Sequence, residues 1–130
     1  MKFYNSNEAG EVVGPYSHCV AAGNTYYISG QVPLHPANGQ LVGSTIQEQT
    51  VQTLCNLRGV LQAAGLSISN IAKTTVFLTS MDDFDGFNEV YSEFMGTHRP
   101  ARLCLGAGEI IHGCLLELDA IAYKKGREQE

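Results

Sequence analysis

Arg102 is the residue whose type and position most directly suggest chemistry. It follows Pro100 by two residues, in an apolar segment where an extended strand should already have begun. An arginine in such a strand is costly to bury unless an anion meets its charge. Its planar guanidinium can bind a carboxylate through two parallel hydrogen bonds, so we expect Arg102 to be buried at a small-molecule site and to bind a ligand carboxylate there. An ion pair with an internal Asp or Glu is the alternative.

Glu117 is the acidic residue that most needs a partner, because it interrupts the apolar segment 115–123. Two hypotheses relate it to Arg102. In the first, the two side chains neutralise each other. In the second, they flank a pocket in which Arg102 binds a substrate and Glu117 binds the reacting water. Alternation along a strand places Asp119 on the same face as Glu117. Asp119 is a candidate second acid, although we favour a solvated position or one that lines a subunit interface.

The cysteines and histidines predict neither a nucleophile nor a metal site. No histidine or other base is evidently paired with Cys104, so we assign this cysteine to packing. His18 and Cys19 are adjacent, and neighbours on a strand face opposite sides, so they cannot both bind a metal from one strand. We expect the histidines to lie at the surface or to be hydrogen-bonded.

The elements that must position these residues alternate between strands and helices. Turn residues and hydrophobic periodicity predict a hairpin with its turn at Gly23–Asn24, followed by a loop over residues 33–43. Two helices are expected, from Ser44 or Thr45 to Gly65 and from Ser80 to Gly96, with a strand over residues 71–79 between them. Two further strands follow, over residues 101–105 and 115–123. Each helix links two strands through a connection long enough for a crossover. We therefore expect an α+β fold, with a mixed sheet and both helices on one of its faces. The other face carries apolar residues such as Ile121 and Tyr123, and such a face is usually covered by another subunit.

Two features inside the predicted helices need an explanation. The second helix has an aromatic stripe that we assign to core packing, and its members are Phe84, Phe87, Tyr91 and Phe94. Asn88 lies beside this stripe, where a polar group is expected to reach a cavity. Gly59 lies inside the first helix at a cost of about 1 kcal/mol relative to Ala, and we attribute it to close packing against the sheet.

One domain over residues 1–130 is expected from the length of the chain, which can bury a core without disulfides or metals. Hydrophobic residues make up 44% of the sequence, and the net charge is -5, from 8 Lys plus Arg against 13 Asp plus Glu. This balance argues against a nucleic-acid partner, because proteins that bind nucleic acids usually carry a basic face. The four cysteines form no CxxC pair, and no apolar run suits a signal peptide or a membrane span. We therefore expect a cytoplasmic protein with reduced thiols and no membrane association.

The sequence contains six segments that together carry a family resemblance: Gly14–Ser17, Ile28–Pro33, Lys73–Leu78, Phe87–Tyr91, Arg99–Arg102 and Leu116–Ala122. In combination they resemble the Rid family of reactive intermediate deaminases, and most closely its RidA-type subgroup. The resemblance implies a chorismate-mutase-like α+β fold and a homotrimer, whose sheets pack into a central β-barrel with active sites between subunits. It also implies hydrolysis of 2-imino acids, such as 2-iminopropanoate and 2-iminobutanoate, to 2-keto acids and ammonia, without metal or organic cofactor.

The resemblance also implies roles for individual residues. Arg102 corresponds to the carboxylate clamp, and Glu117 to the acid that positions and activates water. The positions that line the pocket correspond to Tyr16, Ser29, Gly30 and Asn88. Cys104 corresponds to a residue whose main chain contacts the ligand. Departures from the family pattern are found at His18, at Leu103 and in the loop 106–113.

Two other functions compete with the deaminase hypothesis. The first is a single-stranded RNA endoribonuclease or translation inhibitor, a role also attached to this family. RNA binding would require a basic groove and would depend steeply on salt. The second is a catalytically silent ligand-binding or chaperone-like member, which would keep the fold and lose Arg102 or Glu117. This sequence keeps both.

Overall fold

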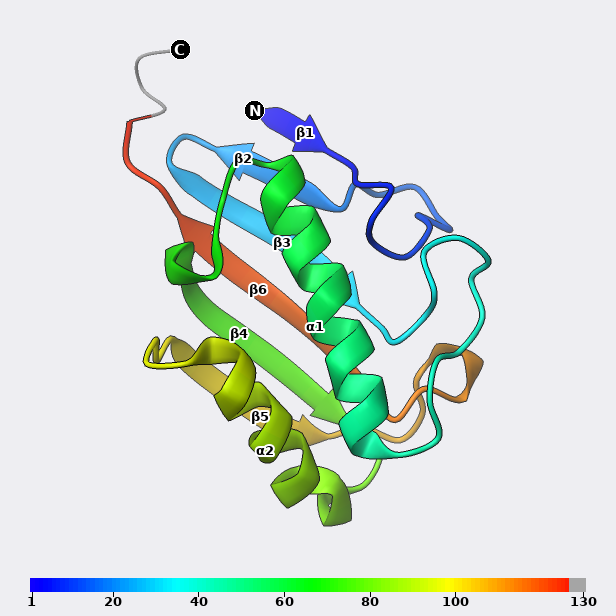
Figure 1. Ribbon diagram of the computed structural model, residues 1–130. Helices are drawn as coiled ribbons and strands as arrows, with labels where there is room; N and C mark the ends of the chain where they lie inside the picture. Colours follow the sequence, from blue (N-terminus) through cyan, green and yellow to red (C-terminus); the bar gives the residue numbers. More distant parts are fainter. Residues whose placement is uncertain (127–130) are drawn as a thin grey trace.

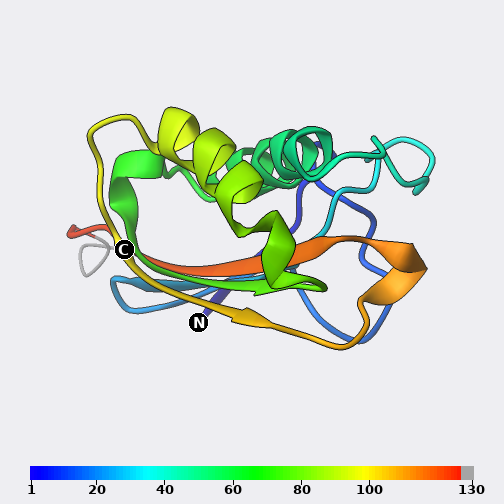
Figure 2. The same cartoon turned by 90° about the horizontal axis from the view of Figure 1, so that it is seen from below.

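A six-stranded mixed sheet carries both long helices on one of its faces (Figure 1 and Figure 2). The computed structural model describes residues 1–126. In chain order, the strands are β1 (Lys2–Tyr4), β2 (Cys19–Ala22), β3 (Thr25–Gln31), β4 (Ile71–Leu78), β5 (Ala101–Gly106) and β6 (Leu116–Tyr123). Their order in the sheet is β1-β2-β3-β6-β4-β5, and only β4 and β5 pair in parallel. The predicted mixed sheet with two helices on one face is confirmed.

Helix α1 (Ile46–Ala63) begins with a capping box. The Thr45 hydroxyl accepts a hydrogen bond from the Glu48 main-chain N–H at 3.1 Å, and a Glu48 carboxylate oxygen accepts one from the Thr45 N–H at 3.2 Å. Of the two starts that the sequence allows, Thr45 is therefore the correct one. Gly65 follows the end of the helix with φ +76°, a conformation that costs glycine little.

Helix α2 (Phe84–Met95) is preceded by a short 3-10 turn, η2 (Met81–Asp83). The sequence suggested a helix that opens at Ser80, but the Ser80 hydroxyl instead caps the turn by accepting from the Asp82 N–H at 3.2 Å. Gly96 ends α2 as expected, with φ +63°.

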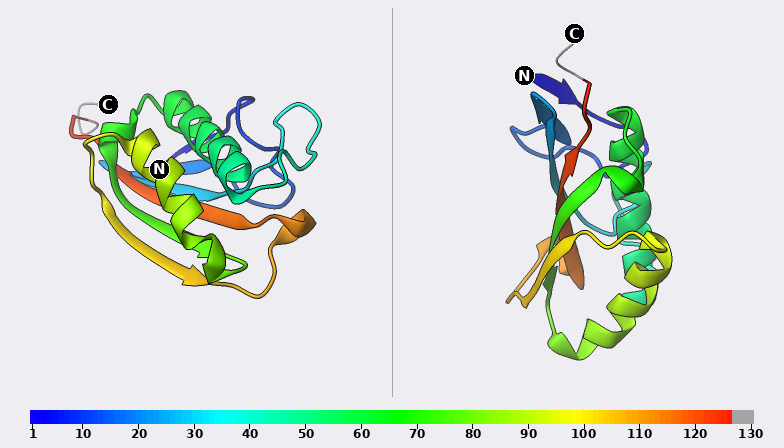
Figure 3. Two further views of the ribbon diagram at one scale, coloured as in Figure 1. Left: turned by 60° about the horizontal axis from the view of Figure 1, so that its bottom comes forward. Right: turned by 90° about the vertical axis from the view of Figure 1, so that its left-hand side faces the viewer.

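The core lies between the sheet and the two helices, and the opposite face of the sheet is bare (Figure 3). Alternation along β6 buries Leu116 and Leu118 against the helices. On the bare face, large apolar side chains are exposed to solvent, and they include Tyr27, Leu103, Leu105, Ile121 and Tyr123. A bare apolar face of this kind is what the sequence predicted.

Gly59 packs against the N-terminal segment, so the prediction that it packs against the sheet is wrong. A Cβ atom at Gly59 would lie 2.6 Å from the carbonyl oxygen of Glu8. The main chain of Glu8 therefore needs a residue without a side chain at this point of α1. The contact holds the N-terminal segment close to the helix.

Replacing Gly59 with Ala is expected to destabilise the protein. In an unconstrained helix this change stabilises by about 1 kcal/mol. Here the new Cβ would collide with the main chain of Glu8, which cannot move aside as a flexible side chain would. Urea denaturation should show a lower midpoint for Gly59→Ala, whereas Gly108→Ala, whose Cβ meets nothing within 4 Å, serves as the control. An unchanged or raised midpoint for Gly59→Ala would contradict the close contact.

Candidate functional site

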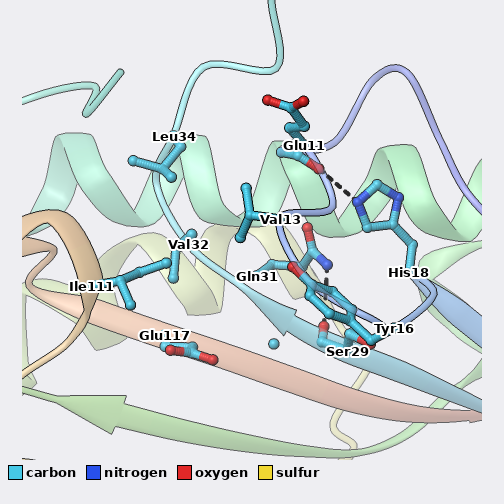
Figure 4. Close-up of a pocket in the computed structure, with 12 residues that line it drawn as sticks. Glu11, Val13, Tyr16, His18, Ser29, Gln31, Val32, Leu34, Ile111 and Glu117 are labelled. Atoms are coloured by element: carbon cyan, nitrogen blue, oxygen red, sulfur yellow. Dashed lines mark hydrogen bonds between the residues drawn. The ribbon is translucent and has the colours of Figure 1, made fainter. Parts of the chain in front are cut away.

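A cavity of about 420 Å³ opens beside β3 and β6 (Figure 4). The residues that line it come from the N-terminal segment, from β3 and the loop after it, from β6, and from the 3-10 turn η3 (Ile111–Gly113). They are Gly10, Glu11, Val13, Tyr16, His18, Ser29, Gly30, Gln31, Val32, Leu34, Ile111 and Glu117. The cavity thus contains four of the residues predicted for the site: Tyr16, Ser29, Gly30 and Glu117.

Glu117 lies directly beside Gly30. Pairing between β3 and β6 shifts register between Ile28 and Gln31, so Ser29 and Gly30 lie at an irregularity of the ladder. A Cβ atom at Gly30 would overlap with the Glu117 carboxylate. Any larger residue would displace the Glu117 side chain from this position, whereas glycine leaves the main chain accessible to a small ligand beside the acid.

The Glu117 carboxyl has no hydrogen-bond or ion-pair partner among residues 1–126. Burial raises its pKa, and the negative charge of Asp119 on the same face raises it further. A half-buried carboxyl without a partner can bind a water molecule and exchange a proton with it. Asp119 therefore influences the site through its charge.

Tyr16 and Ser29 lie together at one end of the cavity (Figure 4). The Ser29 hydroxyl donates to the main-chain carbonyl of Ser17 at 2.6 Å, which fixes its side chain. The Gln31 amide donates to the Ser29 carbonyl at 3.1 Å. Tyr16 is 45% exposed, so its ring forms an open rim of the cavity and not its floor.

His18 is buried and holds the N-terminal segment beside the cavity. Its Nδ1 accepts from the Ser6 main-chain N–H at 2.9 Å, which leaves the proton on Nε2, and Nε2 donates to the Gly10 carbonyl at 2.6 Å. The His18 main-chain N–H also donates to the Asn5 side chain at 2.8 Å. The sequence predicted a surface or hydrogen-bonded histidine but gave no signal that it shapes the cavity wall.

Arg102 lies outside this cavity, at the edge strand β5. It is half-buried, and its guanidinium donates to the Asn88 side-chain oxygen at 2.7 Å. The guanidinium carbon lies 4.9 Å from the centre of the Tyr91 ring, with Phe84 and Phe87 at 5.7 and 5.6 Å. The aromatic stripe assigned to packing therefore also supports Arg102 through cation–π contacts.

No acidic side chain among residues 1–126 pairs with Arg102, so the alternative of an internal ion pair is wrong. The expectation of a buried Arg102 is also corrected, since its side chain is only partly covered. Its contacts with Asn88 and the rings orient the guanidinium without neutralising it. The charge of Arg102 is therefore available to an anion from solvent.

Arg102 and Glu117 lie on opposite faces of the sheet. Arg102 pairs with Thr74 of β4, whose side chain is buried on the helix side and hydrogen-bonds the Tyr91 hydroxyl at 2.8 Å. Glu117 pairs with Phe77 of the same strand, three residues further along. Positions three apart on a strand face opposite sides. Within one chain, the two residues therefore neither neutralise each other nor flank one pocket.

Cys104 lies on the same face as Arg102, two residues further along β5. Burial raises the pKa of its thiol, although the positive charge of Arg102 opposes this effect. The thiol is therefore protonated at neutral pH, which disfavours nucleophilic catalysis. The contact between its main chain and a ligand remains a prediction.

Neither a metal cluster nor a membrane helix is found in the part of the chain that the structure describes. Within residues 1–126, no group of three or more His, Cys, Asp or Glu side chains is placed to hold a metal ion. No helix in the same range is long and apolar enough to cross a membrane.

Comparison with known proteins identifies the family. Residues 6–124 match the family described as Endoribonuclease L-PSP, and the chain belongs to this family. It is 41% identical over 120 residues to a RutC family protein of Pyrococcus horikoshii, covering 92% of this chain and 95% of the relative. It is 40% identical over 123 residues to the 2-iminobutanoate/2-iminopropanoate deaminase of Mus musculus, covering 95% and 91%. These matches confirm the resemblance to the deaminase family.

Two solved structures show the same fold. A crystal structure from Thermotoga maritima has a TM-score of 0.93 and 43% identity, covering 97% of this chain and 99% of that chain. Escherichia coli TdcF with bound serine has a TM-score of 0.91 and 34% identity, covering 96% and 100%. Both agree with the mixed sheet and two helices described above.

Replacing Glu117 with Gln is expected to stabilise the protein at neutral pH. Because its pKa is raised in the fold, the native state binds this proton more tightly than the unfolded chain does. The stability of the wild type therefore falls as pH rises from the unfolded pKa through the folded pKa, and the penalty persists above it. Urea denaturation at one protein concentration should show a larger advantage for Glu117→Gln at pH 7 than at pH 3. An equal advantage at both pH values would contradict an uncompensated carboxylate.

Proposed function

We propose that this protein hydrolyses 2-imino acids to 2-keto acids and ammonia, at sites completed between copies of the chain in a homotrimer. The observation that carries the proposal is a pair of opposite charges, Arg102 and Glu117, neither of which has an ion-pair partner among residues 1–126. Glu117 lies in a cavity on the bare side of the sheet, and Arg102 lies at the sheet edge on the other side. A second copy that covers the bare face can bring its Arg102 to the Glu117 of the first.

The reaction needs an oriented substrate, a placed water and proton transfer. A protonated 2-imino acid is already electrophilic at the imine carbon. In the proposed site, the guanidinium of Arg102 binds the substrate carboxylate through two hydrogen bonds, and Asn88 fixes the guanidinium. Glu117 accepts a proton from water as its oxygen attacks the imine carbon, and returns the proton to nitrogen as the carbon–nitrogen bond breaks. The hydroxyl proton of the intermediate passes to Glu117 as the carbonyl forms and is then released. The protonated imine and one water therefore give one keto acid, one ammonia and one proton.

The remaining predicted residues have roles beside these two. The Gly30 main chain gives the substrate close access to Glu117, since a side chain there would overlap with the carboxylate. Tyr16 and Ser29 form the polar end of the cavity. The main chain of Cys104, on the same strand as Arg102, is proposed to contact the substrate carboxylate. No step requires a metal or an organic cofactor.

The bare sheet face favours assembly. Its exposed side chains include Tyr27, Ile121 and Tyr123 on the central strands, where a monomer would leave them in water. In the proposed trimer, the three sheets pack these faces into a central barrel. The same packing would cover Glu117 further and raise the cost of leaving its charge unpaired.

The similar proteins support this proposal at the level of reaction class. The mouse relative is named a 2-iminobutanoate/2-iminopropanoate deaminase, and TdcF holds serine, a small amino acid with a carboxylate. The family description also contains the word endoribonuclease. Ribonuclease activity is the weaker candidate, because the net charge of -5 provides little attraction for RNA.

The test is the release of ammonia or keto acid from an imine generated in situ by an amino-acid oxidase. The purified protein should speed the release well beyond the spontaneous rate, with imines from alanine or 2-aminobutyrate. Heat-denatured protein gives the baseline. An unchanged rate with both imines would refute the proposed activity.

A further inference from the structure

The cavity beside Glu117 has a polar side and an apolar side (Figure 4). Tyr16 and Ser29 lie on the polar side. The apolar side consists of four aliphatic side chains, which we name the aliphatic wall: Val13, Val32, Leu34 and Ile111. Figure 4 shows Glu117 below Val32 and Ile111, with Tyr16 and Ser29 further to the right, so a ligand whose reacting carbon is near Glu117 can direct one substituent along the wall.

The part of the wall that follows β3 is held rigidly by Asn56. This residue of α1 is buried, and its amide donates to the main-chain carbonyls of both Val32 and Leu34 at 2.9 Å. The Asn56 side-chain oxygen in turn accepts from Gln52 at 2.9 Å. A buried amide with both hydrogen atoms used fixes the two carbonyls in place. The wall is therefore formed before a ligand arrives.

The part of the wall on η3 depends on an unusual turn. His112 has φ +57° and Gly113 has φ +71°, and the Cys114 N–H closes the turn by donating to the Ile111 carbonyl at 3.1 Å. Cys114 is buried and anchors the turn in the fold. The turn presents Ile111, 51% exposed, to the cavity. A left-handed residue other than glycine is uncommon and indicates a constrained position.

The wall leaves apolar surface uncovered beside the reacting group. In the single chain Val13 is 67% exposed and Ile111 51% exposed, and an apolar substituent in the cavity would bury part of both side chains. The cavity of about 420 Å³ lies within the range of sites for ligands much larger than a three-carbon acid. No charged group belongs to the wall, and Glu11 at its rim disfavours an acidic substituent.

We infer that the aliphatic wall is the side-chain subsite of the proposed reaction, and that it selects 2-imino acids with a branched aliphatic side chain, such as the imine of leucine, over the imine of alanine. The inference rests on the proposed function. It assigns Ile111 and Val13 as specificity-determining residues, which contact the substituent and not the reacting atoms. Imines with acidic side chains are disfavoured.

The experiment compares kcat/KM for leucine-derived and alanine-derived imines in the full-length protein. The wild type should favour the leucine-derived imine. Ile111→Ala should lower this ratio about tenfold, the low end of what one methylene contributes to discrimination in an apolar pocket, because Ile111 is half exposed in the single chain. Val13→Trp should also lower the ratio by filling the subsite, and this exposed position tolerates a large side chain. Val51→Ala is the control and should leave the ratio unchanged. Val51 lies on α1, is as exposed as Ile111 at 51%, and does not line the cavity.

A second arm measures binding without turnover, with 4-methyl-2-oxopentanoate and pyruvate titrated by calorimetry. The larger keto acid should bind more tightly to the wild type, and this difference should shrink in Ile111→Ala. If imines are hydrolysed but the wild type shows no preference, or Ile111→Ala keeps the ratio, the subsite is refuted and the proposed function stands. If no imine is hydrolysed faster, the proposed function fails, and the order of keto-acid binding alone decides whether the subsite exists.

Discussion

Glu117→Gln is expected to lower kcat for imine hydrolysis by about 10²–10⁴-fold, the usual contribution of a general base. Gln keeps the size of the side chain but cannot accept a proton from the attacking water. The variant should still bind a 2-keto acid, because the carboxylate of that ligand is bound by Arg102 and not by Glu117. Single-turnover hydrolysis and calorimetric titration with pyruvate or 2-oxobutanoate measure the two effects separately.

The pH dependence provides a second readout for the same residue. Burial and Asp119 raise the pKa of Glu117 in the single chain, and the acidic limb of kcat/KM should report the titration of this carboxyl. This limb should be lost in Glu117→Gln. Glu93→Gln, at an exposed position of α2, is the matched control and should behave like the wild type. Turnover near the wild-type rate in Glu117→Gln would show that another group activates water.

Arg102→Ala is expected to abolish detectable binding of 2-keto acids. Loss of a charged partner from a covered hydrogen-bonded pair costs about 2–5 kcal/mol, which is most of the affinity of so small a ligand. Arg102→Lys should restore binding only in part, since an ammonium lacks the two-pronged geometry of a guanidinium. Because the carboxylate is held in both ground and transition states, kcat/KM should fall mainly through KM.

Arg58 offers a matched control for this experiment. Its guanidinium also lies over an aromatic ring, 5.4 Å from the centre of Phe94, but it extends from α1 and not from β5. Arg58→Ala removes one positive charge and one cation–π contact without touching the proposed site. If Arg58→Ala lost keto-acid binding as severely as Arg102→Ala, net charge and not the clamp would explain the effect.

Local patterns in the sequence predicted most elements of the fold. Capping residues limited the start of α1 to Ser44 or Thr45, and the alternation of apolar residues in segment 115–123 placed Glu117 on the face opposite the core. Each of these signals is contained in a few neighbouring residues. Such signals do not depend on how distant segments pair.

The relation between Arg102 and Glu117 could not be predicted, because it depends on strand register. Each residue has a definite face on its own strand, but only pairing with Thr74 and with Phe77 of β4 shows that the two faces are opposite. β5 and β6 are consecutive in the chain, but β4 separates them in the sheet. The strand order and register of the sheet, and not the local sequence, therefore place Arg102 and Glu117 on opposite faces.

Long-range contacts explain the other residues that sequence reasoning missed. Gly59 meets Glu8 from a distant part of the chain, and His18 hydrogen-bonds Ser6 and Gly10. Neither contact leaves a periodic or compositional signal. The aromatic stripe of α2 is ambiguous for another reason, since the rings that fill a core are equally suited to contact a guanidinium.

Complementation between two inactive variants tests the shared site most directly. Arg102→Ala and Glu117→Gln chains are mixed in equal amounts, unfolded and refolded together, and native mass spectrometry verifies that mixed trimers form. If each site takes its arginine from one copy and its glutamate from the next, about one quarter of the sites regain both wild-type residues. The mixture should then recover about a quarter of the activity of wild type carried through the same cycle. Activity that stays at the level of the separate variants, in trimers shown to be mixed, would contradict a site shared between copies.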